Sequence, residues 1–504
     1  MYYQDVQKLK NLATSLKEMG LDKDSVLDTL TKTIGSNGID ATNEDIRLIV
    51  DEVFIDPLRK RYELTDLGNK ERFLDLYGKK IRFYSNCDRW LVWDGARWVE
   101  DTYGILIQSF AEESVKSILK MDNAFNWDAV QKHHKTSATR TKINAFLALA
   151  QKDSCVNVKA DALDHDPMLL CCQNGTLDLS TGKLREFAPS DMITKMCGTA
   201  YNPTCPTPLF SKFICEIVCG DVELLSYIQK IIGYSLTGKT SEQELYFWTG
   251  KGANGKSTLL SILLAMMGDY AKSTRAKTFA KKPSSAVEND LAALCGARMV
   301  ATSELDAGTV FSDSTIKSLT GDDAISVRFL FKEYFHYVPT YKIIIAANHK
   351  PTIYDTSYAM WRRIRVIPFD YTASEEEKDI YLKDKIIANE LPGVLAWAVE
   401  GCLKYQREGL IPPSSVLAAT ERFKEESNPM GIFLMDCCVI GEEQSAYNKI
   451  LRNRYTDWCK KMACQPISQA QFSEALEALG FAKKRGGTHG EYVWYGVGLR
   501  NAEE

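Results

Sequence analysis

The sequence predicts an α/β fold in which a parallel sheet forms the core and smaller units flank it. Between about residues 240 and 370, short apolar runs bounded by turn residues alternate with helical stretches. Apolar runs of this kind are typical of the central strands of a parallel sheet whose two faces are both covered. The predicted strands are residues 244–248, 298–303, 342–347 and 364–369.

The regions on either side of this core predict separate helical and mixed units. Apolar residues recur at helical spacing near the start, and Gly20 is a predicted helix C-cap. Aromatic and β-branched runs predict a hairpin around Asp94–Gly95, and residues 169–187 predict a second small β element. The predicted domains are a helical segment at 1–75, an α+β region at 76–235, the core at 236–372, a helical region at 373–440 and a C-terminal unit at 441–504.

Charge and composition exclude some classes of protein. The chain has 504 residues, with 62 Lys and Arg against 66 Asp and Glu, and a formal net charge of −4. This balance argues against a uniformly basic surface, although a basic channel can lie within a chain of neutral average.

Neither a run of 18 apolar residues nor an apolar signal region occurs, so no membrane span or signal peptide is predicted. We expect the 14 cysteines to be reduced thiols in a cytoplasm.

A glycine-rich segment between a predicted strand and a predicted helix is the strongest functional signal. Residues 250–258 read GKGANGKST and match the phosphate-binding pattern G-x-x-x-x-G-K-[ST]. Glycines let backbone N–H groups surround phosphates, the lysine reaches the β- and γ-phosphates, and the serine holds Mg²⁺. ATP and Mg²⁺ are therefore the expected cofactors. The predicted contacts are Gly250, Lys251, Gly252, Ala253, Asn254, Gly255, Lys256, Ser257 and Thr258.

Polar residues at the ends of the later strands predict hydrolysis of the bound nucleotide. Glu304 follows the run RMVATS, and Asp306 lies two residues further on, where a carboxylate can bind metal or polarise water. Asn348 follows the apolar run YKIIIAA and can orient the attacking water. Arg362 and Arg363 precede the last strand, and an arginine offered across a subunit boundary can stabilise the charge of phosphoryl transfer.

The order of these motifs resembles the superfamily 3 helicases, and more closely the helicase portion of phage, plasmid and poxvirus primase-helicases. Similar segments include LTDLGNKERF, RWLVWDGARW, NGTLDLSTGKL and ELPGVLAWAVEGCLKYQREGL, and the resemblance covers about residues 60 to 500. It implies an AAA+-like core. It also implies an active ring, usually a hexamer, that threads one DNA strand and moves 3′ to 5′.

The resemblance also implies roles for individual residues. Lys256 matches the nucleotide-binding loop, Glu304 the hydrolytic acid and Asn348 the sensor. Either Arg362 or Arg363 matches the arginine that acts in trans. The tandem acidic pair usual in this family is reduced to Ser303–Glu304. Whether Asp306 also binds the metal therefore stays open.

Two basic segments are candidates for DNA contact. In VRFLFKEYFHYVP, Arg328, Lys332 and His336 recur every four residues, so one regular strand would place them on one face. The segment is also long enough for a hairpin, and the family has its pore hairpin here.

Residues 447–500 resemble a winged helix and hold nine Lys and Arg against four acids. Lys483, Lys484 and Arg485 lie where a wing can touch phosphates, although a protein-docking role stays open.

We therefore expect an ATP-hydrolysing DNA helicase that replicates a phage, plasmid or other mobile element in the cytoplasm of a bacterial host. The expected partners are single-stranded and forked DNA, further copies of the chain in a ring, and a separate primase or single-strand-binding protein. An origin-binding initiator is the alternative, and a regulatory or defence ATPase that does not translocate stays open. Asp161, Asp164 and Asp166 form a dense acidic cluster in loop-like sequence, so we predict no primase centre there.

Overall fold

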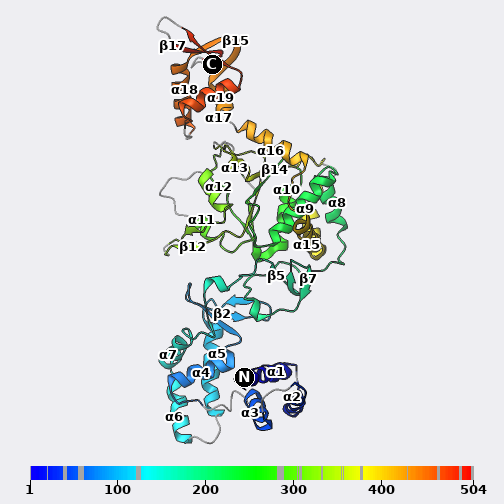
Figure 1. Ribbon diagram of the computed structural model, residues 1–504, viewed down its shortest axis with the longest axis vertical. Helices are drawn as coiled ribbons and strands as arrows, with labels where there is room; N and C mark the ends of the chain where they lie inside the picture. Colours follow the sequence, from blue (N-terminus) through cyan, green and yellow to red (C-terminus); the bar gives the residue numbers. More distant parts are fainter. Residues whose placement is uncertain are drawn as a thin grey trace. The chain divides into compact units, whose positions relative to one another are not determined.

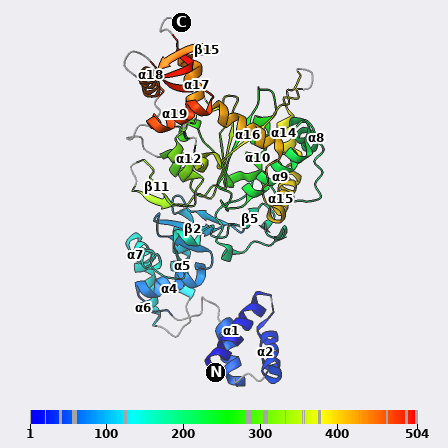
Figure 2. The same cartoon turned by 45° about the horizontal axis from the view of Figure 1, so that its top comes forward.

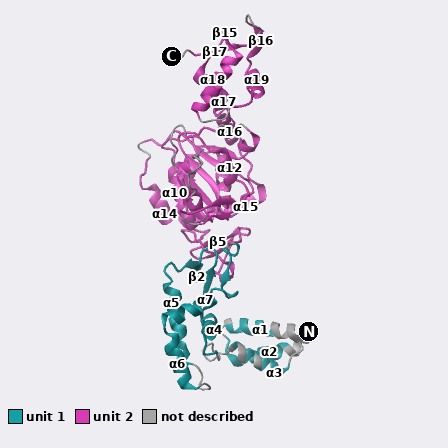
Figure 3. Ribbon diagram, turned by 90° about the vertical axis from the view of Figure 1, so that its left-hand side faces the viewer, with its two compact units in different colours: residues 1–163 teal, residues 164–504 magenta. Residues whose placement is uncertain are grey.

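The computed structural model describes most of the chain as two compact units, residues 1–163 and 164–504 (Figure 3). Each unit has its own hydrophobic clusters. The described residues are 2–19, 21–37, 42–54, 62–120, 126–280, 289–302, 305, 309–330, 333–353, 355, 357–374, 378–427, 429–462, 466–486 and 491–500.

The part of the first unit that the structure describes begins with three helices, as the apolar spacing predicts. They are α1 (Tyr2–Glu18), α2 (Lys23–Asn37) and α3 (Asn43–Phe54). Their shared core includes Leu9, Leu30 and Val50, which are almost fully buried. The C-cap predicted at Gly20 lies outside the described residues.

In its described residues, the rest of the first unit combines four α-helices with a small sheet. The sheet order is β3-β2-β1-β4, and β2 pairs antiparallel with β3. This pairing confirms the hairpin predicted around Asp94–Gly95, whereas β1 and β4 were not predicted. Phe73, Trp90 and Phe146 pack in the core. The elements are α4 (Asp66–Tyr77), β1 (Ile81–Tyr84), β2 (Arg89–Trp93), β3 (Trp98–Glu100), α5 (Ile105–Lys116), α6 (Trp127–Ser137), α7 (Arg140–Ala150) and β4 (Asn157–Val158).

Among the described residues, the centre of the second unit is a sheet of five parallel strands in the order β14-β8-β13-β10-β9. Four of these strands confirm the predicted runs. The short strand β9 was missed because its sequence, AKS, has no apolar pattern. The strands are β8 (Leu245–Thr249), β9 (Ala271–Ser273), β10 (Met299–Thr302), β13 (Lys342–Ala346) and β14 (Ile364–Pro368).

Both faces of this sheet are covered, as continuous apolar strands predict. In β8, Tyr246 and Trp248 pack in one core cluster, and Leu245 and Phe247 pack in the other. Helices α8, α9, α10, α14 and α15 contribute to the first cluster, α11, α12 and α13 contribute to the second, and α16 contributes to both (Figures 1 and 2). These helices are α8 (Pro208–Ile217), α9 (Val222–Leu236), α10 (Lys256–Met267), α11 (Asn289–Ala292), α12 (Asp313–Leu319), α13 (Tyr358–Trp361), α14 (Leu382–Asn389), α15 (Leu391–Glu408) and α16 (Ser414–Glu426).

Within the described part of the chain, no single helix has the length and apolarity to cross a membrane. The bent pair α14 and α15 passes that test jointly, by length and composition alone.

Residues 164–236, which the sequence assigns to the α+β region, pack with the core of the second unit. The predicted small β element forms a three-stranded sheet, and Leu170 and Leu177 from it join the first cluster. Two buried basic side chains also form hydrogen bonds to this region. The Arg298 guanidinium donates to the carbonyl oxygens of Leu169 and Leu236, both at 2.7 Å. The Lys342 side chain donates to the backbone carbonyl oxygens of Thr237 and Lys239. The strands are β5 (Leu169–Cys172), β6 (Gly175–Asp178) and β7 (Lys183–Arg185).

The C-terminal part has its own core, in which Tyr455, Phe472 and Trp494 are buried. The predicted helix, helix and hairpin are present, and Ser468 with Gln471 forms a capping box. One correction concerns the helical prediction for 373–440, because a strand begins at Cys438 and pairs with β17. The elements are α17 (Pro429–Cys437), β15 (Cys438–Tyr447), α18 (Asn448–Lys461), α19 (Gln469–Ala478), β16 (Ala482–Gly486) and β17 (Glu491–Leu499). All cysteines that the structure describes are free thiols.

Candidate functional site

The glycine-rich loop joins the end of β8 to the start of α10 at the carboxyl edge of the sheet. Gly255 has φ +78°, and a Cβ there would lie 2.5 Å from Ile217 Cγ2. A Cβ on Gly250 would lie 2.3 Å from the carbonyl oxygen of Phe369. Both positions therefore need glycine for close packing. The loop presents the N-terminus of a twelve-residue helix, where free backbone N–H groups favour anions.

Lys256 lies at the centre of this loop and is 4% exposed. Its Nζ donates to the Gly250 carbonyl oxygen at 3.2 Å, to Asn254 Oδ1 at 3.0 Å and to Asn348 Oδ1 at 3.1 Å. Burial lowers the pKa of Lys256 to about 8. The ammonium is thus held by neutral acceptors that phosphate oxygens can replace.

Asn348 reaches the loop because of the strand order. β13 lies between β8 and β10, so the residue that follows β13 emerges next to the glycine-rich loop. The predicted acid, Glu304, follows β10 in the sequence. Strand β10 ends at Thr302 and is the neighbour of β13 on the side away from β8. Ser303, Glu304 and Asp306 lie outside the described residues. The described part of this edge thus brings Lys256, Asn254 and Asn348 together.

A triphosphate fits these residues on structural grounds. The loop offers an exposed helix N-terminus, a buried cation and close backbone approach, and Ser257 at the start of α10 is exposed. A hydroxyl in that position is a suitable ligand for the magnesium that accompanies a nucleotide.

Arg362 and Arg363 lie at the opposite edge of the sheet. They precede β14, whose first residue pairs with the first residue of β8. About 16 Å of strand therefore separates them from the loop of the same chain, at roughly 3.3 Å per residue. Arg362 Nη2 donates to Gln243 Oε1 at 2.7 Å, and Arg363 Nη1 donates to the Ala359 carbonyl oxygen. Neither arginine can serve the phosphate loop of its own chain in this arrangement.

The basic segment after β11 forms an antiparallel hairpin. Strands β11 (Ile325–Val327) and β12 (Phe335–Tyr337) pair with Val327 opposite Phe335. The hairpin expected from the length of this segment is thus confirmed, and Arg328, after β11, and His336, in β12, do not lie on one regular strand. Lys332 lies outside the described residues.

One side of the hairpin carries a cation and an aromatic ring. The Arg328 guanidinium lies 4.7 Å from the centroid of the Tyr334 ring, which is 59% exposed. Alternation along the strand places His336, which is exposed, on the same side as Tyr334. Phe335 and Tyr337 pack towards the protein interior, and Tyr337 Oη donates to the Leu291 carbonyl oxygen at 2.8 Å. The polar side of the hairpin is thus free to contact a ligand.

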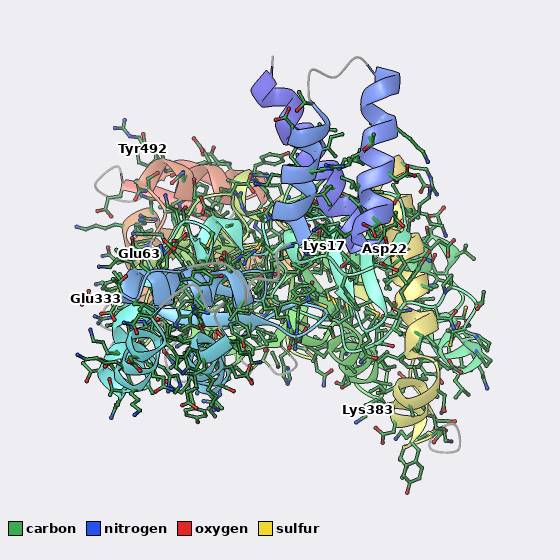
Figure 4. The ribbon with its side chains drawn as sticks, turned by 90° about the horizontal axis from the view of Figure 1, so that it is seen from below. Lys17, Asp22, Glu63, Glu333, Lys383 and Tyr492 are labelled. Atoms are coloured by element: carbon green, nitrogen blue, oxygen red, sulfur yellow. The ribbon has the colours of Figure 1, made fainter. Side chains whose placement is uncertain are left out.

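The predicted wing is the β16–β17 hairpin, and its three basic residues differ in environment. Lys483 Nζ donates to Ser473 Oγ at 3.0 Å and lies 5.4 Å from the Trp494 ring centroid, so it serves the packing of this unit. Lys484 and Arg485 are exposed. The ring of Tyr492, labelled in Figure 4, is 48% exposed and lies 5.9 Å from the Arg485 guanidinium.

Other polar clusters from the sequence have structural partners. The Asp164 carboxylate accepts from Lys195 Nζ at 2.6 Å. Residues 132–142 read KHHKTSATRTK, a further basic stretch for which DNA contact and a solvated surface both stay open from the sequence. There, Lys142 pairs with Asp66 at 3.0 Å, and His133 Nε2 lies 2.9 Å from Asn69 Oδ1. Sequence reasoning missed Gln243, because a glutamine in a loop carries no signal of its own.

Comparisons with known proteins agree with the motif order. Residues 70–219 match the family model described as D5 N terminal like, and residues 248–363 match a family of unknown function (DUF5906). The mimivirus protein "Putative helicase L207/L206", from Acanthamoeba polyphaga mimivirus, is 28% identical over 55% of this chain and 31% of its own length. The family models and the viral relatives thus support a likeness to the primase-helicase family.

Further relatives come from other large DNA viruses. "Putative helicase 022R" of Frog virus 3 (isolate Goorha) is 29% identical over 38% of this chain and 22% of its own length. A "Putative primase" of African swine fever virus (strain Badajoz 1971 Vero-adapted) is 26% identical over 40% of this chain and 22% of its own length. These matches span between about a fifth and a third of each relative. The apo structure of the NrS-1 C-terminal region aligns with 85% of this chain and 99% of its own chain, at 11% identity and a TM-score of 0.46.

Proposed function

We propose that the chain is an ATP-dependent DNA helicase of the AAA+ type that assembles into a ring, with six subunits expected. It hydrolyses ATP to ADP and phosphate and moves 3′ to 5′ on single-stranded DNA. In this way it unwinds duplex DNA during replication of a phage, plasmid or other mobile element. The observation that carries the proposal is the convergence of Lys256, Asn254 and Asn348 at the loop before α10. The names of the viral relatives support the helicase role.

The proposed site divides its tasks between two copies of the chain. In the first copy, the glycine-rich loop binds the phosphates of ATP, Lys256 neutralises their charge, and Ser257 and Glu304 bind Mg²⁺. Magnesium, when bound, withdraws charge from the phosphates. Asn348 orients the attacking water from its place beside Lys256. Because the paired arginines lie at the far edge of the sheet, an arginine must come from the second copy.

The proposed DNA path uses the hairpin of β11 and β12. Arg328, Lys332 and His336 supply positive charge or hydrogen bonds to phosphates, and Tyr334 supplies a ring on which a base can stack. The C-terminal unit, proposed to be a winged helix, offers Lys484 and Arg485 to the DNA backbone. In this proposal the basic side chains that contact DNA are confined to the hairpin and the C-terminal unit, which is compatible with a net charge of −4 for the whole chain.

The deciding experiment measures ATP hydrolysis by the purified chain with and without single-stranded DNA, and unwinding of a 3′-tailed duplex. We expect DNA to stimulate hydrolysis and Lys256→Ala to abolish both activities. Lys212→Ala is the matched control, because that lysine side chain is 76% exposed on α8, outside the proposed site. An equal rate of ATP hydrolysis with and without DNA, together with no unwinding of the duplex, would contradict the proposal.

The C-terminal unit favours one alternative, an origin-binding replication initiator that uses ATP mainly to load a ring. Residues 447–500 carry nine basic and four acidic side chains, and the unit has its own hydrophobic core. Removal of residues 441–504 separates the two functions. Loss of sequence-specific duplex binding with intact unwinding of forked DNA would favour the initiator.

A further inference from the structure

A pocket at the amino edge of the sheet holds the two arginines together with residues that the proposed mechanism has not used. Its lining includes Gln243, Asp322, Asp323, Arg362 and Arg363. Gln243 comes just before β8, and Asp322 comes between α12 and β11. The pocket therefore gathers side chains from three separate parts of the chain around one guanidinium pair.

Three of these side chains form a directed chain of hydrogen bonds. Gln243 Nε2 donates to Asp322 Oδ2 at 3.0 Å, and Arg362 Nη2 donates to Gln243 Oε1 at 2.7 Å. A carboxylate can only accept and a guanidinium can only donate, so the amide of Gln243 has a single orientation here. Thr240 Oγ1 donates to Asp322 Oδ1 at 3.2 Å and holds the carboxylate in turn.

The backbone at Gln243 is held in an uncommon conformation. Its φ is +55°, in the left-handed region that residues other than glycine rarely adopt. Its N–H donates to the Thr240 carbonyl oxygen at 2.9 Å, so a tight turn sets the start of its side chain. Strained residues of this kind persist where the surroundings over-determine them, and they cluster at functional sites.

The two arginines differ in what holds them. Arg363 Nη1 donates to the carbonyl oxygen of Ala359, four residues earlier, so this guanidinium folds back on its own helical turn. Arg362 is instead held by a side chain from another part of the fold. Only Arg362 is therefore tied to residues that can set the direction of its guanidinium.

We propose that Arg362 is the arginine presented to the ATP phosphates of a neighbouring subunit, and that Gln243 and Asp322 are its positioning residues. This inference rests on the proposed ring ATPase and specifies which side chains build its shared site. Gln243 takes one guanidinium nitrogen, and the remaining donors of Arg362 face the phosphates. Asp322 accepts a hydrogen bond from the Gln243 amide and so sets its orientation, and it does not itself contact the nucleotide.

The test compares steady-state ATP hydrolysis, with single-stranded DNA, for single variants. We expect Arg362→Ala to lower kcat by about 10³-fold, the usual scale for a trans-acting arginine. Gln243→Ala should lower kcat by roughly 10- to 100-fold, because small misplacement of a catalytic group has effects of this size. KM for ATP should change little, since the phosphate loop of the other subunit is intact. Lys212→Ala, at an exposed position on α8 outside the pocket, is the control, and Arg363→Ala should cost less than Arg362→Ala.

A rescue experiment separates positioning from general damage to the fold. Gln243→Glu places two carboxylates together and should lower kcat, whereas Gln243→Glu with Asp322→Asn restores a donor, an acceptor and the original charge, and should recover kcat. Mixing Gln243→Ala subunits with Lys256→Ala subunits should also give more activity than either alone, because the latter still present Arg362 to intact phosphate loops. A merely structural role for Gln243 predicts neither recovery.

The outcomes are distinguishable. A wild-type chain with no DNA-stimulated ATP hydrolysis overturns the proposed function, and this inference with it. A wild-type chain that hydrolyses ATP, with Gln243→Ala equally active or with Arg363→Ala more damaging than Arg362→Ala, overturns the inference alone.

Discussion

The Nζ of Lys256 lies 3.1 Å from Oδ1 of Asn348, so the phosphate-loop lysine is joined to the residue that follows the neighbouring strand. The two residues are 92 positions apart in the chain. Their contact exists because β8 and β13 are adjacent parallel strands that end at the same edge of the sheet. Binding of ATP would replace this bond with contacts to phosphate oxygens, and the free amide would then be available to water.

Nucleotide affinity should fall as pH rises above about 8. Burial lowers the pKa of Lys256 to about 8 in the free protein, and phosphates bind its charged form. Above that pH, binding must take up a proton, so affinity should weaken by up to about tenfold per pH unit. Titration calorimetry in buffers of different ionisation enthalpy should show this proton uptake. AMP, which lacks the β- and γ-phosphates, is the control, and an equal pH dependence for AMP would contradict the assignment.

Asn348→Ala should uncouple nucleotide binding from hydrolysis. The substitution removes the side chain proposed to orient water but leaves the glycine-rich loop in place, so we expect ATP affinity within a few-fold of wild type. The rate of hydrolysis should fall by about 10²-fold, as for loss of one preorganised polar group in an active site. Equilibrium binding of a slowly hydrolysed analogue and single-turnover hydrolysis measure the two effects. Equal losses in both would show that Asn348 only supports the loop.

Arg328→Ala and Tyr334→Ala should weaken binding of single-stranded DNA in different ways. Loss of the Arg328 charge should reduce the slope of log affinity against log salt by about 0.7, the value for one phosphate contact on a single strand. Loss of the Tyr334 ring should cost about 1–3 kcal/mol of binding and leave the slope unchanged. Fluorescence anisotropy over a salt series measures both. Arg422→Ala, at an exposed position on α16, is the control.

Arg365→Met should destabilise the second unit. Arg365 Nη2 lies 2.6 Å from Glu244 Oε1, and the Glu244 side chain is 5% exposed. Removal of the arginine leaves a buried carboxylate without its counter-charge, which costs about 3–5 kcal/mol of the free energy of unfolding. Urea unfolding followed by circular dichroism measures the loss. Lys424→Met breaks a pair that is exposed on both sides and should cost less than about 1 kcal/mol.

The same pair predicts how the destabilisation depends on pH. Burial raises the pKa of Glu244 to about 7, above its ordinary value of 4.5, while Arg365 opposes the shift. A carboxyl whose pKa is raised on folding favours the folded state at low pH, and this contribution is lost as pH rises through the folded pKa. Arg365→Met should therefore be more destabilising at pH 8 than at pH 6, and an equal loss at both values would contradict the account.

Local sequence patterns predicted much of the fold. Helical spacing located the N-terminal helices, continuous apolar runs located β8, β10, β13 and β14, and a Ser-x-x-Gln pattern located the cap of α19. The failures have local causes as well. Strand β9 is too short and polar to show a pattern, and the helical prediction for 373–440 missed the start of β15 at Cys438.

By itself, the sequence determined the glycine-rich loop, the strands that the candidate residues follow, and the resemblance to primase-helicases, because these features depend on neighbours in the chain. The tertiary structure decided which residues meet. It set Asn348 beside Lys256, put Arg362 at the far edge of the sheet, and joined Arg362 to Gln243 across 119 positions of sequence. Strand order and packing of the sheet faces arise from contacts between distant segments, and no local pattern of residue types encodes them.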